Sequence, residues 1–299
     1  MTSISFFFQV HQPKKLRDFR IFEIGKSDEY FDSKENEYQM RKAANDCYIP
    51  MARLLKKLIK QNNGDFKFAL SFSGMFLEQA EEYTPEVIHY YQELVATGCV
   101  EIIGESYYDT IAFYKDKEEW KKQIKLHKNK IQKLFNLTPK TFKNTHFAYS
   151  DDLAKEIASL GFNTVLLEEI ENTSPRKVYS NPSERLQILF NDQSLSDDLT
   201  KRFSNNQWDQ FPLTTEKYVS WLAANTKDNQ CINLFFDIHT FGMKNLNESG
   251  IFEFLRYLPS KIIETKGLDI YLPSTISAIP LSCPSFSCPE VITSADKNR

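Results

Sequence analysis

Ionisable side chains recur where the apolar runs of this sequence end. The residues are His11 after FFFQV, Glu105 after CVEIIG, His146 after TFKNT, Glu168 after NTVLL, and Asp237 with His239 after NLFF. An ordinary surface loop has no need of acids and imidazoles at these places, since Ser or Lys would serve as well. Because the set would ring one mouth of the fold, we interpret it as a candidate functional site.

Two kinds of chemistry fit these side chains. A pair of carboxylates flanking a pocket can hydrolyse a glycoside, one as acid/base and the other as nucleophile. Alternatively, histidines and an aspartate can hold a divalent metal, and His11, His146, Asp237 and His239 would make such a set. Asp237 and His239 stand at i and i+2, which share one face of a strand, so both can point into one cavity. The residues alone leave the two alternatives open.

Alternating strands and helices must position these residues. Apolar runs predict strands over 3–10, 65–74, 99–106, 138–146, 163–169, 231–242 and 268–273. Helical spacing and end signals predict helices over 38–61, 84–98, 116–136, 150–162 and 249–267, with an amphipathic segment over 213–225.

This order of elements predicts an α/β fold with a parallel sheet. Successive βα units follow one another without the GxGxxG turn of a nucleotide-binding fold, which favours a barrel over a doubly wound sheet. In a parallel barrel the functional residues lie at the carboxyl ends of the strands, where the ionisable groups are found. We expect one barrel domain over residues 1–299.

The bulk composition excludes several other classes of protein. Of the 299 residues, 41% are hydrophobic and 26% charged, as in ordinary globular proteins. A net charge of -3 offers no basic patch to nucleic acid. No run reaches the ~18 apolar residues of a membrane span, and the N-terminus lacks the regions of a signal peptide. An odd count of 5 cysteines without CxxC spacing predicts reduced thiols and a cytoplasmic location.

Several longer segments carry a family resemblance. FQVHQP at 8–13, GCVEIIGESYYDTI at 98–111, TFKNTHFAYSDDLA at 141–154 and NLFFDIHTFG at 233–242 resemble the first four conserved regions of glycoside hydrolase family 57, in its α-amylase-like branch. RFSNNQWDQFPLT at 202–214 and GIFEFLRYLP at 250–259 fit the same branch. The resemblance implies an incomplete (β/α)7 TIM-like barrel related to some deacetylases. It also implies retaining chemistry on α-glucans such as starch, glycogen or maltooligosaccharides, with no metal or other cofactor.

The match to the family is partial at the catalytic positions. By resemblance Asp237 stands at the acid/base position, whereas His146 stands where the family carries its nucleophile glutamate. Asp109 stands where the family usually has a histidine. His239 belongs to the pair of residues after Asp237 that differs from the family pattern. The positions that keep the family pattern, or lie beside the acid, are expected to bind substrate: His11, Gln12, Glu105, Tyr107, Glu168, Arg202, Trp208, Asp209 and His239. The C-terminal helical region of the family is expected to lie beyond this chain.

The substitution at His146 leads to three functional hypotheses. Retaining hydrolysis needs a second carboxylate about 5 Å from the acid, and a neutral imidazole supplies no negative charge to the transition state. The leading hypothesis is therefore an α-glucan-binding protein with impaired hydrolysis. The first alternative is an active hydrolase or transferase that pairs Asp237 with another carboxylate, such as Glu105 or Glu168. The second is a metal-dependent hydrolase with the histidine set described above.

Overall fold

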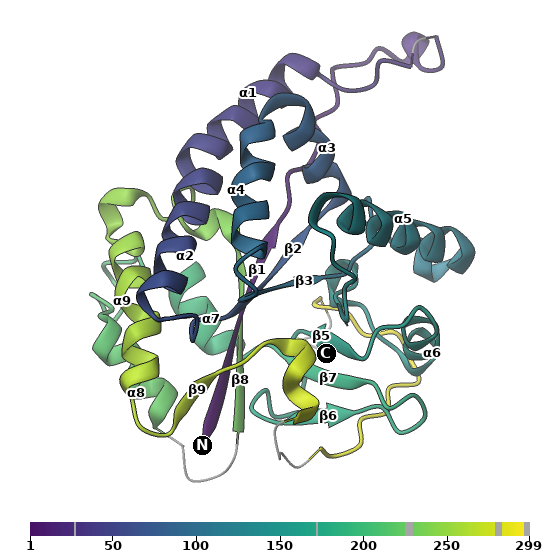
Figure 1. The fold of residues 1–299 in the computed structure, drawn as a ribbon. Helices are drawn as coiled ribbons and strands as arrows, with labels where there is room; N and C mark the ends of the chain where they lie inside the picture. The colour runs from purple at the N-terminus through teal and green to yellow at the C-terminus, as the bar shows by residue number, and fades with distance from the viewer. Residues whose placement is uncertain (27, 172, 225–229, 279–282, 296–299) are drawn as a thin grey trace.

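Parallel strands form an incomplete barrel in the computed structural model, which describes residues 1–295 except 27, 172, 225–229 and 279–282 (Figure 1). The strands are β1 (Thr2–Val10), β2 (Phe68–Phe72), β3 (Val100–Ile103), β4 (Thr141–Phe142), β5 (Thr164–Leu167), β6 (Val178–Ser180), β7 (Gln187–Phe190), β8 (Gln230–Asp237) and β9 (Leu268–Ile270). One sheet has the order β3-β2-β1-β8, with β9 also paired to β1, and the other has the order β4-β5-β7-β6.

Two parallel bridges join these sheets into the barrel. Gly104 pairs with Phe142 between β3 and β4, and Asn191 pairs with Asn233 between β7 and β8. Among the strands of the described residues, β6 alone runs antiparallel, as a short partner of β7. The predicted α/β class and the incomplete (β/α)7 barrel are therefore confirmed.

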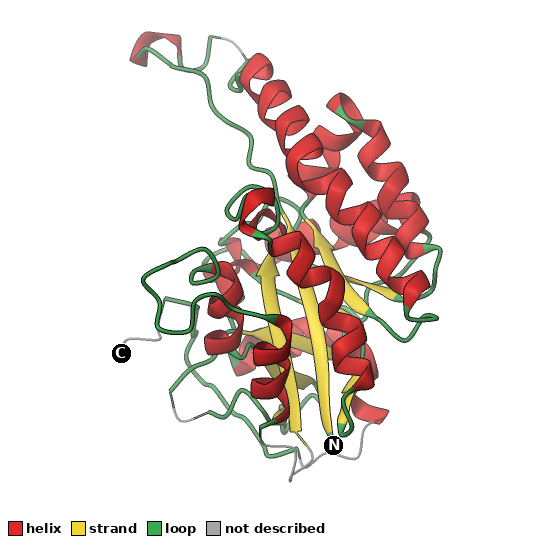
Figure 2. Ribbon diagram, turned by 90° about the vertical axis from the view of Figure 1, so that its left-hand side faces the viewer, coloured by secondary structure: helices red, strands yellow, loops and turns green. Residues whose placement is uncertain are grey.

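Helices cover the outside of the strands (Figure 2). They are α1 (Ser33–Ala43), α2 (Ile49–Gln61), α3 (Gly74–Tyr83), α4 (Pro85–Val95), α5 (Lys117–Phe135), α6 (Asp151–Ser159), α7 (Gln193–Thr200), α8 (Thr215–Ala223) and α9 (Ile251–Glu264). Local end signals place several of them: Asp116 caps α5 and Ser150 caps α6, each accepting a backbone N–H of the first turn. The helix predicted over 38–61 is α1 and α2 joined by a π-helical turn, Ala44–Tyr48.

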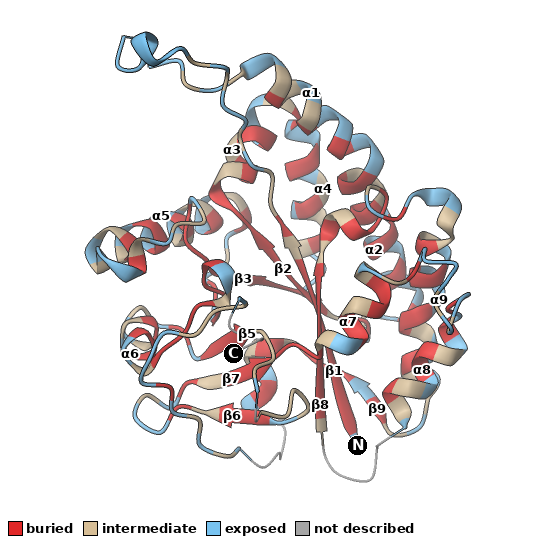
Figure 3. Ribbon diagram, turned by 180° about the vertical axis from the view of Figure 1, so that it is seen from behind, coloured by how far each residue is buried: buried red, intermediate tan, exposed pale blue. Residues whose placement is uncertain are grey.

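The strands are buried, as the rear view shows (Figure 3). β1 lies at the centre, and Ile4, Phe6, Phe8 and Val10 are fully buried in the largest apolar cluster. Packing on both faces explains why the strand reads as a continuous apolar run. In the part of the chain that is described, no helix is long and apolar enough to cross a membrane. None of the five cysteines is paired in a disulfide.

Two strand ends differ from the sequence prediction. β4 ends at Phe142, so His146 lies in a following 3-10 turn, Thr145–Phe147. β8 ends at Asp237, so His239 lies in the next 3-10 turn, Ile238–Thr240. The expectation that Asp237 and His239 share a strand face is therefore wrong, although the turn still brings their side chains together.

Candidate functional site

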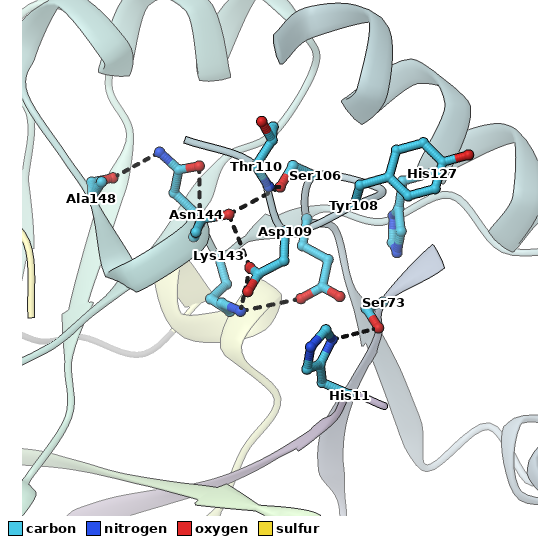
Figure 4. A network of polar contacts seen from close by, with 12 residues as sticks. His11, Ser73, Ser106, Tyr108, Asp109, Thr110, His127, Lys143, Asn144 and Ala148 are labelled. Carbon is cyan, nitrogen blue, oxygen red and sulfur yellow. Dashed lines mark hydrogen bonds and ion pairs between the residues drawn. The ribbon is translucent and has the colours of Figure 1, made fainter. Parts of the chain in front are cut away.

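The carboxyl ends of β1, β3, β4 and β8 bring charged side chains around His11. The Nδ1 atom of this imidazole lies 2.8 Å from Oγ of Ser73, which also caps α3 (Figure 4). Burial lowers the pKa of His11, and the negative charges of Asp109, Glu105 and Asp237 partly oppose that effect. Three carboxylates, two from the segment after β3 and one from the end of β8, therefore act electrostatically on one imidazole.

Glu105 and Lys143 form the buried centre of this mouth. The side chains are 3% and 2% exposed, and Lys143 Nζ donates to Glu105 Oε2 over 3.3 Å. Lys143 is also 4.0 Å from Oδ1 of Asp109. Burial raises the pKa of Glu105, while the neighbouring ammonium of Lys143 acts in the opposite direction. Sequence reasoning missed Lys143, because nothing in its local pattern distinguishes a buried lysine from the usual exposed one.

Asp109 is held beside the turn that carries His146. Its Oδ1 accepts a hydrogen bond of 2.9 Å from the hydroxyl of Thr145. That hydroxyl lies 3.1 Å from Oγ of Ser106, which in turn accepts the backbone N–H of Thr110 (Figure 4). Asp109 has φ 52°, a left-handed conformation that Asp tolerates better than most residues. The network fixes one oxygen of a carboxylate that is 31% exposed.

Both oxygens of Asp237 are bonded. The backbone N–H of His239 donates to Oδ1 over 3.0 Å, and Nδ1 of the same imidazole lies 3.3 Å from that oxygen. Lys244 Nζ donates to Oδ2 over 2.6 Å. Burial alone would raise the pKa of Asp237, but the contacts with His239 and Lys244 outweigh it and hold the pKa well below the usual range. Asp237 is thus held as a carboxylate.

Tyr48 connects the ends of β1 and β8. Its hydroxyl donates to Oε1 of Gln12 over 2.8 Å and lies 2.8 Å from Nε2 of His239. Tyr48 comes from the π-helical turn between α1 and α2, where its ring is fully buried. Through Tyr48, the helical segment outside the barrel contacts residues at the mouth. No sequence pattern predicted this contact.

His146 is the exposed residue of the 3-10 turn Thr145–Phe147. Its φ is 52° and that of Phe147 is 53°, so two consecutive residues without a glycine adopt left-handed geometry. The carbonyl of His146 accepts the N–H of Ser294 over 2.8 Å, and the ring of Phe147 stacks on Phe235 at 5.7 Å. The position of His146 is therefore fixed by its backbone hydrogen bond and by the packing of its neighbour Phe147.

Comparison with known proteins identifies the family. Residues 5–280 of the chain match the sequence model of the family described as Glycosyl hydrolase family 57. The chain belongs to glycosyl hydrolase family 57. It is 38% identical over 274 residues to a provisionally named α-amylase of Methanocaldococcus jannaschii, which covers 89% of this chain and 57% of that protein. The chain thus spans little more than half the length of this curated family 57 relative.

Solved structures show the same fold. The 4-α-glucanotransferase of Thermococcus litoralis superposes with a TM-score of 0.72 at 19% identity, over 96% of this chain and 42% of that one. A family 57 branching enzyme of Thermococcus kodakaraensis gives a TM-score of 0.72 at 10% identity, over 96% of this chain and 73% of that one. At these identities the likeness concerns the fold.

The metal site proposed as an alternative from the sequence is not supported by the positions of its predicted ligands in this family 57 chain. Among the described residues, no group of three or more His, Cys, Asp and Glu side chains is placed to hold a metal ion. His11, His146, Asp237 and His239 are all described, so the set predicted from the sequence does not converge. Of these four, Asp237 and His239 are in direct contact.

The other predicted binding residues lie at different depths in the family 57 barrel. Tyr107 is buried, with its ring against Gly74, where an added Cβ would lie 2.3 Å from it. Glu168 follows β5 and accepts the amide of Asn191 over 3.0 Å. Glu168 therefore lies at a strand end, as expected, whereas Tyr107 lies in the segment after β3.

Arg202, Trp208 and Asp209 lie on the loop between α7 and α8. Arg202 donates to Asp198 over 2.7 Å, and its guanidinium is 5.5 Å from the centre of the Trp208 ring. Trp208 also packs edge-on against Trp221, and Asp209 is exposed. The contacts of Arg202 and Trp208 connect this loop to α7 and α8, and their role in substrate binding stays a prediction.

Proposed function

We propose that this family 57 protein binds α-glucans at the mouth of its barrel and that its hydrolytic activity is impaired. The observation that carries the proposal is the ion pair between Lys244 and Asp237, with Nζ and Oδ2 at 2.6 Å. A general acid must hold a proton near the working pH, and this cation favours the deprotonated carboxylate. Asp237 then has no proton to give to a leaving glycosidic oxygen.

The residue at position 146 supports the same proposal. The resemblance aligns His146 with the nucleophile of the family, and an imidazole lacks the carboxylate that stabilises an oxocarbenium-like transition state. Its turn after β4 supplies no acidic side chain of its own. Loss of both the acid and the nucleophile would lower the rate by several orders of magnitude.

Binding is supported by the polar groups that surround the mouth. His11, Glu105 and Asp109 offer donors and acceptors at fixed positions, and the ring of Tyr108, 47% exposed, offers a surface for a sugar ring. Relatives named as an α-amylase and a 4-α-glucanotransferase make an α-linked glucan the first substrate class to test. We also propose that the barrel forms a single domain.

Isothermal titration with maltoheptaose tests this proposal. We expect saturable binding at micromolar to low-millimolar ligand, and weaker binding of cellopentaose, whose β-linkages place successive rings differently. The variant Tyr108→Ala should weaken maltoheptaose binding by a few fold through lost stacking. His89→Gln, at an exposed position on α4, is the matched control and should bind as the wild type. Absence of heat with maltoheptaose at 10 mM, in folded protein, would reject the proposal.

A second candidate function is hydrolysis with Glu105 as the proton donor. Burial raises the pKa of Glu105, as is required of a carboxyl group that keeps its proton near neutral pH. Its test is the release of reducing sugar from maltoheptaose by wild type and by Glu105→Gln. This candidate requires measurable release that Glu105→Gln abolishes while binding persists.

A further inference from the structure

An arm between β1 and α1 projects from the barrel and ends in exposed apolar side chains (Figure 1). The described part of the arm is residues 14–26 and 28–32. At its tip, Ile21, Phe22 and Ile24 are 77%, 79% and 63% exposed. Large apolar side chains gathered in water are unfavourable, because their burial lowers the free energy of the system. The tip is therefore a candidate contact surface.

The arm is ordered, so its tip is held out into solvent by local structure. At its base the backbone N–H of Arg17 donates to the carbonyl of Tyr30 over 3.1 Å. At its tip the chain forms a 3-10 turn, Ile21–Glu23, in which Oε2 of Glu23 accepts the backbone N–H of Arg20 over 3.1 Å. A contact segment that is ordered before it binds loses less conformational entropy on docking.

An apolar groove of about 340 Å³ lies between α8, α9 and the loop before α8. Its lining includes the large apolar side chains of Phe203, Phe211, Phe254 and Tyr257. Phe211 and Tyr257 are exposed. Glu216 and Glu253 also line the groove; Glu253 lies 3.4 Å from Arg256, whereas no described residue forms an ion pair with Glu216. The groove thus offers an apolar surface beside an unpaired anion.

The tip of the arm complements this groove in both shape and charge. Phe22 supplies an aromatic side chain that the groove is large enough to hold. Arg20 directly precedes the tip, is exposed, and has no ion-pair partner in the described part of the chain, so its guanidinium can pair with Glu216. The arm as a whole is balanced between acidic and basic side chains, so it has no general attraction to an anionic membrane.

The arm and the groove of one molecule face different directions. Figure 1 and Figure 3 show the arm on the opposite side of the molecule from α8 and α9. The arm therefore does not fill its own groove, and the matching surface belongs to another molecule.

We infer that the tip of the arm docks into the α8–α9 groove of a second copy of this chain, with Phe22 in the groove and Arg20 paired with Glu216. An aromatic side chain in an apolar pocket commonly carries much of the affinity of an interface. Because the contact joins two different surfaces, a two-fold dimer makes it twice. The inference does not depend on the proposed function.

Sedimentation velocity of the protein between about 1 and about 200 µM tests the contact. Wild type should associate as its concentration rises, with a Kd on the order of micromolar. Phe22→Ser should weaken association at least about tenfold. Leu126→Ser is the matched control, because Leu126 is also an exposed large apolar residue but lies on α5, and it should associate as the wild type. Wild type that stays monomeric at the highest concentration overturns the inference.

Exchange of charges tests the pairing of Arg20 with Glu216. Arg20→Glu and Glu216→Arg should each weaken association about three- to tenfold, because each places like charges opposite one another. The double variant with both changes should recover association to within about threefold of wild type. If the double variant does not recover, the placement of the arm in this groove is overturned.

A mixture of two variants separates contact of an arm with a groove from contact of two arms. Tyr257→Ser removes an exposed ring of the groove and should lose self-association, as Phe22→Ser does. An equimolar mixture of the two still offers one intact arm and one intact groove, so it should associate more strongly than either variant alone. If Tyr257→Ser associates as the wild type, the arm binds another surface and the inference is overturned.

Discussion

The ammonium of Lys244 lies 2.6 Å from one carboxylate oxygen of Asp237, and the N–H of His239 lies 3.0 Å from the other. Both partners come from the loop that follows β8. Asp237, the residue that the sequence resemblance aligns with the acid/base position, is thereby an ion-pair partner.

Replacing Lys244 with methionine should raise the pKa of Asp237 toward the ordinary aspartate value of about 3.9. A carboxyl group whose pKa is lowered by folding stabilises the fold above its unfolded pKa, and that stability is lost as the pH falls below it. The stability difference between wild type and Lys244→Met should therefore be full above about pH 5 and shrink below about pH 4, with a size of about 1 kcal/mol or less at this half-exposed pair.

Carbon-13 NMR titration of the carboxyl groups measures this pKa directly. Lys201→Met, which removes the partner of Asp197, is the control and should leave the pKa of Asp237 unchanged. An unaltered Asp237 titration in Lys244→Met would show that Lys244 does not set the charge of this group.

Restoring a carboxylate at position 146 should not restore hydrolysis by itself. In His146→Glu, Asp237 is still held deprotonated, so release of reducing sugar from maltoheptaose should stay near background. The double variant with Lys244→Met should exceed His146→Glu by on the order of 10²-fold, the size of a general-acid contribution. His146→Gln with Lys244→Met is the control and should show no gain. Equal rates in His146→Glu and the double variant would contradict this explanation.

His127 should make the fold less stable at acidic pH. It is fully buried on α5, and its Nε2 lies 2.8 Å from the carbonyl of Phe72. Burial lowers its pKa from 6.5 to about 4. Because the unfolded chain takes up the proton first, stability is full above about pH 6.5 and falls as the pH drops toward 4, by about 3 kcal/mol at most.

Urea unfolding at several pH values checks this effect. His127→Gln stays neutral and should flatten the pH dependence between 6.5 and 4. His89→Gln, with a side chain that is 70% exposed, should keep the wild-type profile. A wild-type stability that is constant across this interval would rule out a neutral buried His127.

The C-terminal strap, residues 283–295, should hold the turn of His146 in place. Ser294 donates its backbone N–H to the carbonyl of His146 over 2.8 Å, and Ile292 and Tyr149 exchange two backbone hydrogen bonds. Ser294→Pro removes that N–H, so amide exchange in residues 145–149 should accelerate by about fivefold, as expected for the loss of one hydrogen bond of about 1 kcal/mol. Ser294→Ala keeps the N–H and should exchange as the wild type. Equal exchange in the two variants would show that the strap does not restrain the turn.

The strand ends of the barrel were predictable because a run of apolar residues gives way to polar or charged residues there. β1 is buried on both faces, so its apolar run ends where the chain reaches the mouth at His11. Glu105 and Asp237 were placed correctly for the same reason. The charge state of Asp237 was not predictable. Its partner Lys244 lies seven residues further along the chain, on a loop whose path the sequence does not reveal.

The turns after the strands were the part that sequence could not predict. His146 and Phe147 have positive φ without a glycine, which no local propensity favours. Helix α3 was missed because Gly74 was interpreted as the end of the strand predicted over 65–74, whereas it begins α3 and is a small residue required by the ring of Tyr107. Lys143 was missed because its burial depends on Glu105 and Asp109, which lie in the segment after β3.

Whether Asp237 acts as a general acid is measured by analysing the products of maltoheptaose incubated with wild type and with Asp237→Asn, in parallel with binding. We expect that both proteins bind the ligand and that wild type releases no more product than Asp237→Asn, because Asp237 carries no proton to transfer. Steady release by wild type that Asp237→Asn abolishes would contradict it, since Asp237 would then be acting as the acid despite its contacts with Lys244 and His239.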